Sequence, residues 1–344
     1  MQLERSNGRA APPTHLSDGN DLTFEDGFLE ERRLQSSFVS GRRMGTLNYV
    51  ALKRSEKAKR PEIINHIRLS KDLDHPNIVR FYEWYETRKH LWLVVELCTG
   101  GSLESIIIRD ECLPEDVVRK FGWDLVKGLE HIHKLQIIFS DLTPENVCTC
   151  HHMYQAPSIF IFFCLSLLFI FQLSLIPQIL VDSSGLLKLN NFCYSKKVED
   201  TLDYFNTLCL TCEDTGKRKY DPRHQGINIR KRFQGSPTYM APEVLRGSDN
   251  TVNSDLWALG CVLYYMYTGR PPFSSSCYSE LKEMILCQEP PSLTQKAFDT
   301  VCQGTLPSQD FQCLLECLLS KNPDERMTMP ELLKHSFWTP KEKN

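Results

Sequence analysis

Short hydrophobic runs separated by turn residues characterise the first third of the chain, after a polar start. Residues 1–26 are rich in Gly, Pro, Ser, Asn and Asp and lack periodicity, which is typical of a disordered segment. Residues 38–53 have the pattern of a β-hairpin with its turn between Gly41 and Gly45. Two further strands are predicted at 78–84 and His90–Glu96. These segments together predict a small β-rich lobe.

The remainder of the chain has the period of amphipathic helices. A short helix is predicted to begin near Pro61, because proline is favoured in a first helical turn. Longer helices are predicted at 113–133, 251–269 and 310–319. Strands followed by helices predict an α+β molecule with a small β-rich N-lobe and a larger α-helical C-lobe.

Composition narrows the function classes. The chain has 344 residues and a formal net charge of -3, so it lacks the basic footprint of a nucleic-acid-binding protein. Its 14 cysteines do not have paired metal-ligand spacings, and its first residues are too polar for a secretory signal. We therefore expect free thiols in a reducing, cytoplasmic location, no metal site and no nucleic-acid partner.

An ordered series of motifs resembles the protein kinase signature set. In chain order these are Val50-Ala51-Leu52-Lys53, His75-Pro76-Asn77, Val95 with Glu96-Leu97-Cys98, Asp141-Leu142-Thr143-Pro144-Glu145-Asn146, Asn191-Phe192-Cys193, Gly235-Ser236-Pro237-Thr238-Tyr239-Met240-Ala241-Pro242-Glu243 and a late Arg326. The segment 83–103 resembles the Unc-51-like serine/threonine kinase family. Asn191-Phe192-Cys193 and residues 41–43 resemble the pseudokinase branch of that family.

The resemblance implies a two-lobed protein-kinase fold over residues 27–338. The N-lobe would cover 27–95, the hinge 96–101 and the C-lobe 102–338, with a tail at 339–344. Glu243 and Arg326 would form the structural ion pair of the C-lobe.

The same resemblance implies a nucleotide site whose adenine-binding part is intact. Ala51 would lie above the adenine ring and Leu180 below it, with Val95 as gatekeeper and the backbone of Glu96 and Cys98 as hinge. Lys53 would meet the phosphates, and Asn146 and Asn191 would occupy the two metal-ligand positions. These residues predict ATP binding.

The parts that transfer phosphate are mostly replaced, although Asp141 matches the catalytic aspartate. Segment 31–37 has no glycine where a glycine-rich loop should cover the phosphates. His66 replaces the helix glutamate that pairs with Lys53, and Glu62, one turn earlier, is expected to be exposed. Asn191 replaces the aspartate that holds magnesium, and an amide offers that cation no charge.

We therefore expect a pseudokinase that binds ATP independently of magnesium and acts as a scaffold or regulatory partner. Its protein partners cannot be named from the sequence. The alternative is an active serine/threonine kinase that transfers the γ-phosphate of ATP to proteins through Lys53, Asp141 and Asn146.

Residues 147–178 interrupt the resemblance. They contain an uncharged run, 159–176, whose 18 residues reach the lower limit of a membrane span. A span would place Asn146 and Leu180, neighbours in a kinase site, on opposite sides of a bilayer. Joining Asn146 directly to Ile179 restores an uninterrupted loop and strand. We expect a translated intron; a genuine loop insertion and a membrane segment are the alternatives.

Overall fold

The computed structural model describes residues 23–24, 28–35, 38–43, 49–150, 185–201, 204–205, 207–209, 235–291, 293 and 306–339. The chain divides into two units. The first consists of Met1–Asp74, Val79–Leu97 and Asn191–Gln234, and the second of His75–Ile78, Cys98–Asn190 and Gly235–Asn344. The boundary after Leu97 lies within the predicted hinge. Residues 191–234, assigned from sequence to the C-lobe, belong to the first unit.

The first unit is built on a six-stranded sheet in the order β1-β2-β3-β4-β6-β5. Its strands are β1 (Thr23–Phe24), β2 (Phe28–Gln35), β3 (Phe38–Arg43), β4 (Tyr49–Glu56), β5 (Phe81–Glu86) and β6 (His90–Glu96). All neighbours are antiparallel. Val50, Leu52, Trp92 and Val94 form a buried cluster on this sheet, because alternate side chains of β4 and β6 share a face.

The sheet agrees with one prediction for the first part of the chain and differs from two. The predicted 38–53 hairpin is confirmed as β3 and β4, with Phe38 opposite Lys53. The predicted disordered segment 1–26 is wrong at its end, since Thr23–Phe24 forms β1 against Leu29 and Phe28. The strand predicted at 78–84 begins later, because Ile78 instead bridges Leu189 in the second unit.

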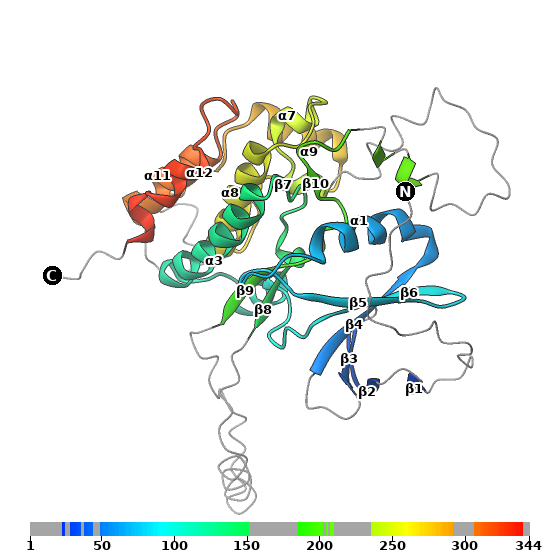
Figure 1. Ribbon diagram of the computed structural model, residues 1–344. Helices are drawn as coiled ribbons and strands as arrows, with labels where there is room; N and C mark the ends of the chain where they lie inside the picture. Colours follow the sequence, from blue (N-terminus) through cyan, green and yellow to red (C-terminus); the bar gives the residue numbers. More distant parts are fainter. Residues whose placement is uncertain are drawn as a thin grey trace, which may run out of the picture. The chain divides into compact units, whose positions relative to one another are not determined.

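One long helix of the first unit, α1 (Arg60–Ser70), follows the 3₁₀ turn η1 (Lys57–Lys59) and carries Pro61 in its first turn, as predicted. It lies along one face of the sheet (Figure 1). Ile63 is 2% exposed, and His66 contacts Phe81 of β5 edge to face. The helix therefore turns Ile63 and His66 toward the sheet, one strand of which, β4, carries Lys53.

The second unit is mainly helical, which with the sheet confirms the predicted α+β class. It contains α2 (Leu103–Asp110), α3 (Glu115–Lys134), α7 (Pro242–Leu245), α8 (Val252–Thr268), α9 (Tyr278–Cys287), α11 (Gln309–Leu318) and α12 (Met329–Leu333). Short elements are β7 (Ile137–Ile138), β10 (Lys196–Lys197, in the first unit), and the 3₁₀ turns η2 (Pro144–Asn146), η3 (Pro237–Tyr239) and η4 (Ser336–Trp338). Helices α3 and α11 pack against α8 (Figure 1).

A buried ion pair ties the second unit together. Arg326 is 2% exposed, and its Nη1 and Nη2 donate to Oε1 and Oε2 of Glu243 at 2.7 and 3.0 Å. This confirms the predicted pair. The bidentate geometry matches two donors to two acceptors, so neither buried charge is left unpaired.

A two-stranded sheet of β8 (Val147–Cys150) and β9 (Leu186–Leu189) follows the loop that carries Asp141. Asp124 of α3 accepts from the backbone N–H of Leu187 at 3.1 Å and so orients β9. The first residues of the suspected insertion therefore form a regular strand.

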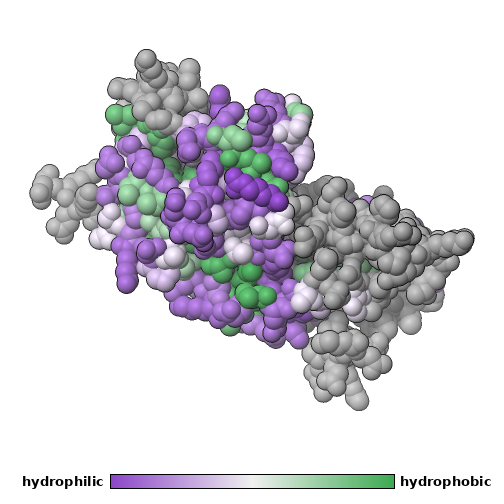
Figure 2. Space-filling view, turned by 90° about the horizontal axis from the view of Figure 1, so that it is seen from above, coloured by the Kyte–Doolittle hydropathy of each residue, from purple (hydrophilic) through white to green (hydrophobic). Residues whose placement is uncertain are grey.

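Leu180 and the run 159–176 lie outside the described residues. Among the helices that are described, none combines the length and the hydropathy needed to cross a membrane. Seen from above, the described surface is mostly hydrophilic, with hydrophobic residues in separate small areas (Figure 2).

Candidate functional site

Lys53 and Asn191 meet in the first unit. Lys53 lies on β4 opposite Leu93 of β6, and its Nζ donates to Oδ1 of Asn191 at 3.2 Å. Asn191 has φ +68°, a conformation that asparagine adopts more readily than most residues. The lysine ammonium therefore bonds a neutral amide oxygen at the position where the kinase motif has a carboxylate.

His66 connects α1 to the Asn191-Phe192-Cys193 triplet. The backbone N–H of Phe192 donates to Nδ1 of His66 at 2.9 Å, and the imidazole is 4% exposed. Burial, assisted by the positive charge of Lys53, lowers the pKa of His66 to about 3. The ring is therefore neutral at physiological pH and acts as a hydrogen-bond acceptor.

Lys53 and Asn191 also line a cavity of about 380 Å³ in the first unit. Its walls are residues of β4, η1, α1, β6 and the triplet segment, namely Lys53, Arg54, Ser55, Glu56, Lys59, Glu62, Ile63, His90, Asn191, Cys193 and Tyr194. The expectation that Glu62 is exposed is wrong, because Glu62 is only 9% exposed and faces this cavity. The volume is within the roughly 300–1,000 Å³ typical of small-molecule sites.

The residues expected around adenine are distributed over both units. Ala51 and Val95 face each other across β4 and β6 and are 5% and 4% exposed. Glu96 ends β6, and its carboxylate accepts from the backbone N–H of Arg80 at 3.1 Å. Cys98 belongs to the second unit and is partly buried. Leu180 lies outside the described residues.

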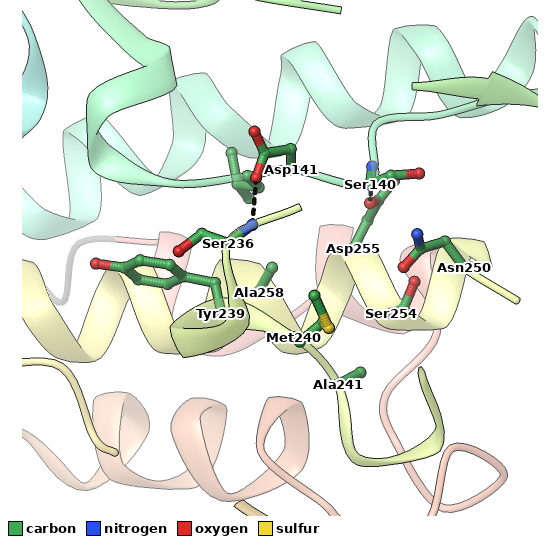
Figure 3. A pocket seen from close by; sticks show the side chains of 11 residues that line it. Ser140, Asp141, Ser236, Tyr239, Met240, Ala241, Asn250, Ser254, Asp255 and Ala258 are labelled. Carbon is green, nitrogen blue, oxygen red and sulfur yellow. Dashed lines mark hydrogen bonds between the residues drawn. The ribbon is translucent and has the colours of Figure 1, made fainter. Parts of the chain in front are cut away.

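Asp141 is held by its own unit. Its Oδ1 accepts from the backbone N–H of Ser236 at 2.8 Å, and its Oδ2 accepts from Nδ2 of Asn146 at 2.6 Å. Figure 3 shows the Ser236 contact beneath the carboxylate. Asp141 is 7% exposed, and burial raises its pKa above the usual range. The sequence identified Gly235 and Ser236 as the start of the Gly-Ser-Pro-Thr-Tyr motif, but it did not predict their contact with Asp141.

The backbone of Gly235 packs directly on Asp141. A Cβ at this position would lie 2.6 Å from both Oδ1 of Asp141 and the carbonyl oxygen of Ser140, so only glycine allows this approach. The space enclosed by Asp141, Ser236, Tyr239 and their neighbours is about 10 Å³. That is near the minimum for a single water molecule.

One of the two magnesium-ligand positions of a kinase has lost its charge in this chain. Among the described residues, no three His, Cys, Asp or Glu side chains are grouped as metal ligands. Oδ1 of Asn191 accepts from the Lys53 ammonium, and Nδ2 of Asn146 donates to Asp141. A kinase holds magnesium through one aspartate, the catalytic-loop asparagine and the nucleotide phosphates. Asn146 keeps that asparagine, whereas Asn191 replaces the aspartate, carries no charge and already faces the Lys53 ammonium.

Comparison with known proteins supplies the family. The protein kinase domain family matches residues 35–155 and 177–338 and leaves 156–176 unmatched. The chain is similar to the serine/threonine-protein kinase ULK4 of Mus musculus, at 43% identity over 300 residues, which are 87% of this chain and 20% of the relative.

Two Arabidopsis thaliana proteins are also similar. The chain is 33% identical to the serine/threonine-protein kinase RUNKEL over 307 residues, 89% of this chain and 18% of the relative. It is 27% identical to the serine/threonine-protein kinase ATG1a over 328 residues, 90% and 43%. It thus spans about a fifth of the length of its first two relatives, at 20% and 18%. The chain belongs to the protein kinase family, as a member of its Unc-51-like group.

Proposed function

We propose that this chain is the nucleotide-binding domain of an Unc-51-like pseudokinase, which presents a folded surface to protein partners and transfers phosphate weakly or not at all. The observation that carries the proposal is the state of Asp141. A general base must accept a proton from the substrate hydroxyl within hydrogen-bond distance. Each carboxylate oxygen of Asp141 already accepts an internal hydrogen bond, and Gly235 packs against Oδ1, so a substrate hydroxyl must compete for the remaining acceptor positions.

ATP binding is the retained part of the function. Ala51 and Val95 provide an apolar wall for a base, the backbone at Glu96 and Cys98 provides hinge contacts, and Lys53 provides a cation for the phosphates. Because the Lys53 partner Asn191 is neutral, that ammonium charge is not cancelled by this contact. We therefore propose ATP binding that does not depend on magnesium, in a cytoplasmic protein without a nucleic-acid partner.

Nucleotide binding is tested by thermal unfolding with ATP, in magnesium and in EDTA. We expect ATP to stabilise the chain equally in both, by about 2.7 kcal/mol at a concentration of 100 Kd. Lys53→Met should weaken this stabilisation, because it removes the cation that meets the phosphates. A strict magnesium requirement would contradict the proposal.

Phosphoryl transfer is tested with radiolabelled ATP on the chain itself and on generic protein substrates. We expect background incorporation, and no recovery in Asn191→Asp, because the helix glutamate replaced by His66 and the glycines missing from segment 31–37 would still cost rate. The names of the relatives, serine/threonine-protein kinases, favour the alternative of an active enzyme. Robust incorporation that Asp141→Ala abolishes would establish that alternative.

A further inference from the structure

Helix α1 carries an amide that binds the backbone beyond the Asn191-Phe192-Cys193 triplet. Nδ2 of Asn65 donates to the carbonyl oxygens of Cys193 and Ser195, at 3.2 and 2.8 Å. Asn65 is fully buried, and it is adjacent to His66, which accepts from the N–H of Phe192. Two consecutive residues of α1 therefore hold the backbone at Phe192, Cys193 and Ser195.

Arg68, one turn further along α1, extends this contact with an ion pair. Its Nη1 and Nη2 donate to Oδ1 and Oδ2 of Asp200 at 3.1 and 2.6 Å, and Nη2 also donates to Oδ1 of Asn65 at 2.9 Å. Asp200 in turn accepts from the backbone N–H of Lys197 at 2.8 Å. The Arg68 guanidinium thus links the side-chain amide of Asn65 on α1 to the turn at residues 197–200.

The Arg68–Asp200 pair is shielded enough to matter energetically. The two side chains are 20% and 6% exposed, and Tyr204 covers the guanidinium at 4.4 Å from its ring centre. Hydrogen bonds between charged groups that are shielded from water contribute more than an exposed ion pair does. An apolar contact supports the pair: Phe205, Leu208 and Cys209 pack on Ile64, with Ile67 and Trp84 alongside.

The consequence concerns Lys53. Asn191, an acceptor for its ammonium, directly precedes Phe192, whose N–H is held by His66, and the backbone that follows is held by Asn65 and Arg68, so these contacts determine where Asn191 lies. Resting on the function proposed above, we propose that Asn65, Arg68 and Asp200 form a latch that positions Asn191 against Lys53 for nucleotide binding. Asn65 and Arg68 act as positioning residues through the backbone of residues 192–200.

The test compares two arginines of α1. Arg68→Ala removes the latch, whereas the matched control Arg60→Ala removes the ion pair of α1 with Glu86 on β5. ATP affinity and hydrogen exchange at the Phe192 amide are measured for both in the full chain. We expect Arg68→Ala to raise the Kd for ATP and the exchange rate about tenfold, in the usual range of coupling between sites. Arg60→Ala should lower Tm yet change both quantities less than about twofold.

Rescue separates positioning from general destabilisation. The charge swap Arg68→Asp with Asp200→Arg should recover part of the ATP affinity that Arg68→Ala loses, whereas Arg68→Asp alone should not. If Arg68→Ala and Arg60→Ala raise the Kd equally, or if Phe192 exchange rises without a change in Kd, the latch does not position the site and the proposal is overturned. If the unmodified chain binds no ATP, the proposed function fails, and unchanged Phe192 exchange in Arg68→Ala would then reject the latch separately.

Discussion

Asn191 and His66 are neutral groups at positions where the kinase motif has carboxylates. Each takes an internal hydrogen bond instead, Asn191 from Nζ of Lys53 and His66 from the N–H of Phe192. Because each replacing side chain accepts a hydrogen bond from a polar neighbour, its buried acceptor atom is satisfied although the charge is lost. At the scale of residues, neutral side chains that form hydrogen bonds within the chain therefore replace two carboxylates of the kinase motif.

The buried imidazole of His66 predicts how stability depends on pH. The pKa falls from 6.5 to about 3 on folding, so between these values the unfolded chain binds the extra proton. The contribution of neutral His66 to the free energy of unfolding is thus fully present above pH 6.5 and is lost as the pH falls toward 3. The free energy of unfolding should decrease by about 1.4 kcal/mol per pH unit between pH 6 and 5 from this group alone.

Urea unfolding at pH 7, 6 and 5 measures this effect against His66→Phe. The variant loses an acceptor for Phe192, which costs stability equally at each pH, but it has no proton to gain. Its stability should therefore fall less steeply than that of the unmodified chain, by the amount above. Parallel pH profiles for the two proteins would show that His66 is not buried in neutral form.

At the scale of elements, α8 has well-defined ends. Thr251 and Ser254 form a capping box at its start, and Gly269 ends it with φ +71° while its N–H donates to the carbonyl of Tyr265. A Cβ on Gly269 would lie 2.0 Å from the carbonyl oxygen of Glu111, so the loop after α2 closes against this cap. The cap therefore fixes both the helix end and a neighbouring turn.

A comparison of alanine substitutions at Gly269 and at Gly247, which lies after α7, separates backbone strain from steric overlap. Gly247 also has a positive φ, +106°, but a Cβ there would meet no atom within 4 Å. Gly247→Ala should cost about 1–2 kcal/mol of unfolding free energy from backbone strain alone. Gly269→Ala should cost clearly more, because Glu111 must also move. Chemical denaturation measures both; an equal loss would contradict the close approach of Glu111.

The sequence predicted long helices better than it predicted strands. Helices expected at 113–133, 251–269 and 310–319 are observed as Glu115–Lys134, Val252–Thr268 and Gln309–Leu318. Their period and caps are local signals. The strand Thr23–Phe24 was missed because it is defined only by its pairing with β2, which local composition does not reveal.

The candidate site was likewise predicted where local motifs identify residues and missed where long-range contacts place them. Lys53, Asp141 and Asn191 were found through motifs, whereas the burial of Glu62 was not. The orientation of α1 is set by contacts such as Asn65 to Ser195, which join residues 130 positions apart. The contact of Ser236 with Asp141 likewise joins residues 95 positions apart, and the motif alone does not predict it.

At the scale of the whole molecule, either of two sequences could form the strand that follows Asn146 and pairs with β9. Val147–Cys150 pairs with Leu186–Leu189 as β8 and β9. Removal of 147–178 would place 179–182 at the same distance after Asn146 and leave three residues before Leu186. The unmatched residues 156–176 lie inside the expected insertion but are fewer. We therefore retain the translated intron as a proposal.

Two deletions test it. Deleting 147–178 should give a chain that melts cooperatively at a higher temperature than the full chain, because it removes an uncharged apolar run that promotes association. Deleting only 156–176 is the matched control, which keeps Val147–Cys150 and lengthens the connection. If the control folds and the larger deletion does not, Val147–Cys150 is the native strand. Transcript sequencing should show Asn146 and Ile179 codons joined in most messages.

Strand β8 also contains a cysteine that would be present only in a chain that retains residues 147–178. Cys148 occupies the second place after Asn146, which Leu180 would take in the joined chain, and it is partly buried with Nδ2 of Asn190 at 3.5 Å from its sulfur. A thiol forms a covalent adduct with an electrophile, and a leucine does not. Alkylation at this one position, read by mass spectrometry of cell extracts, would therefore count the molecules that retain the segment without reference to their messenger RNA.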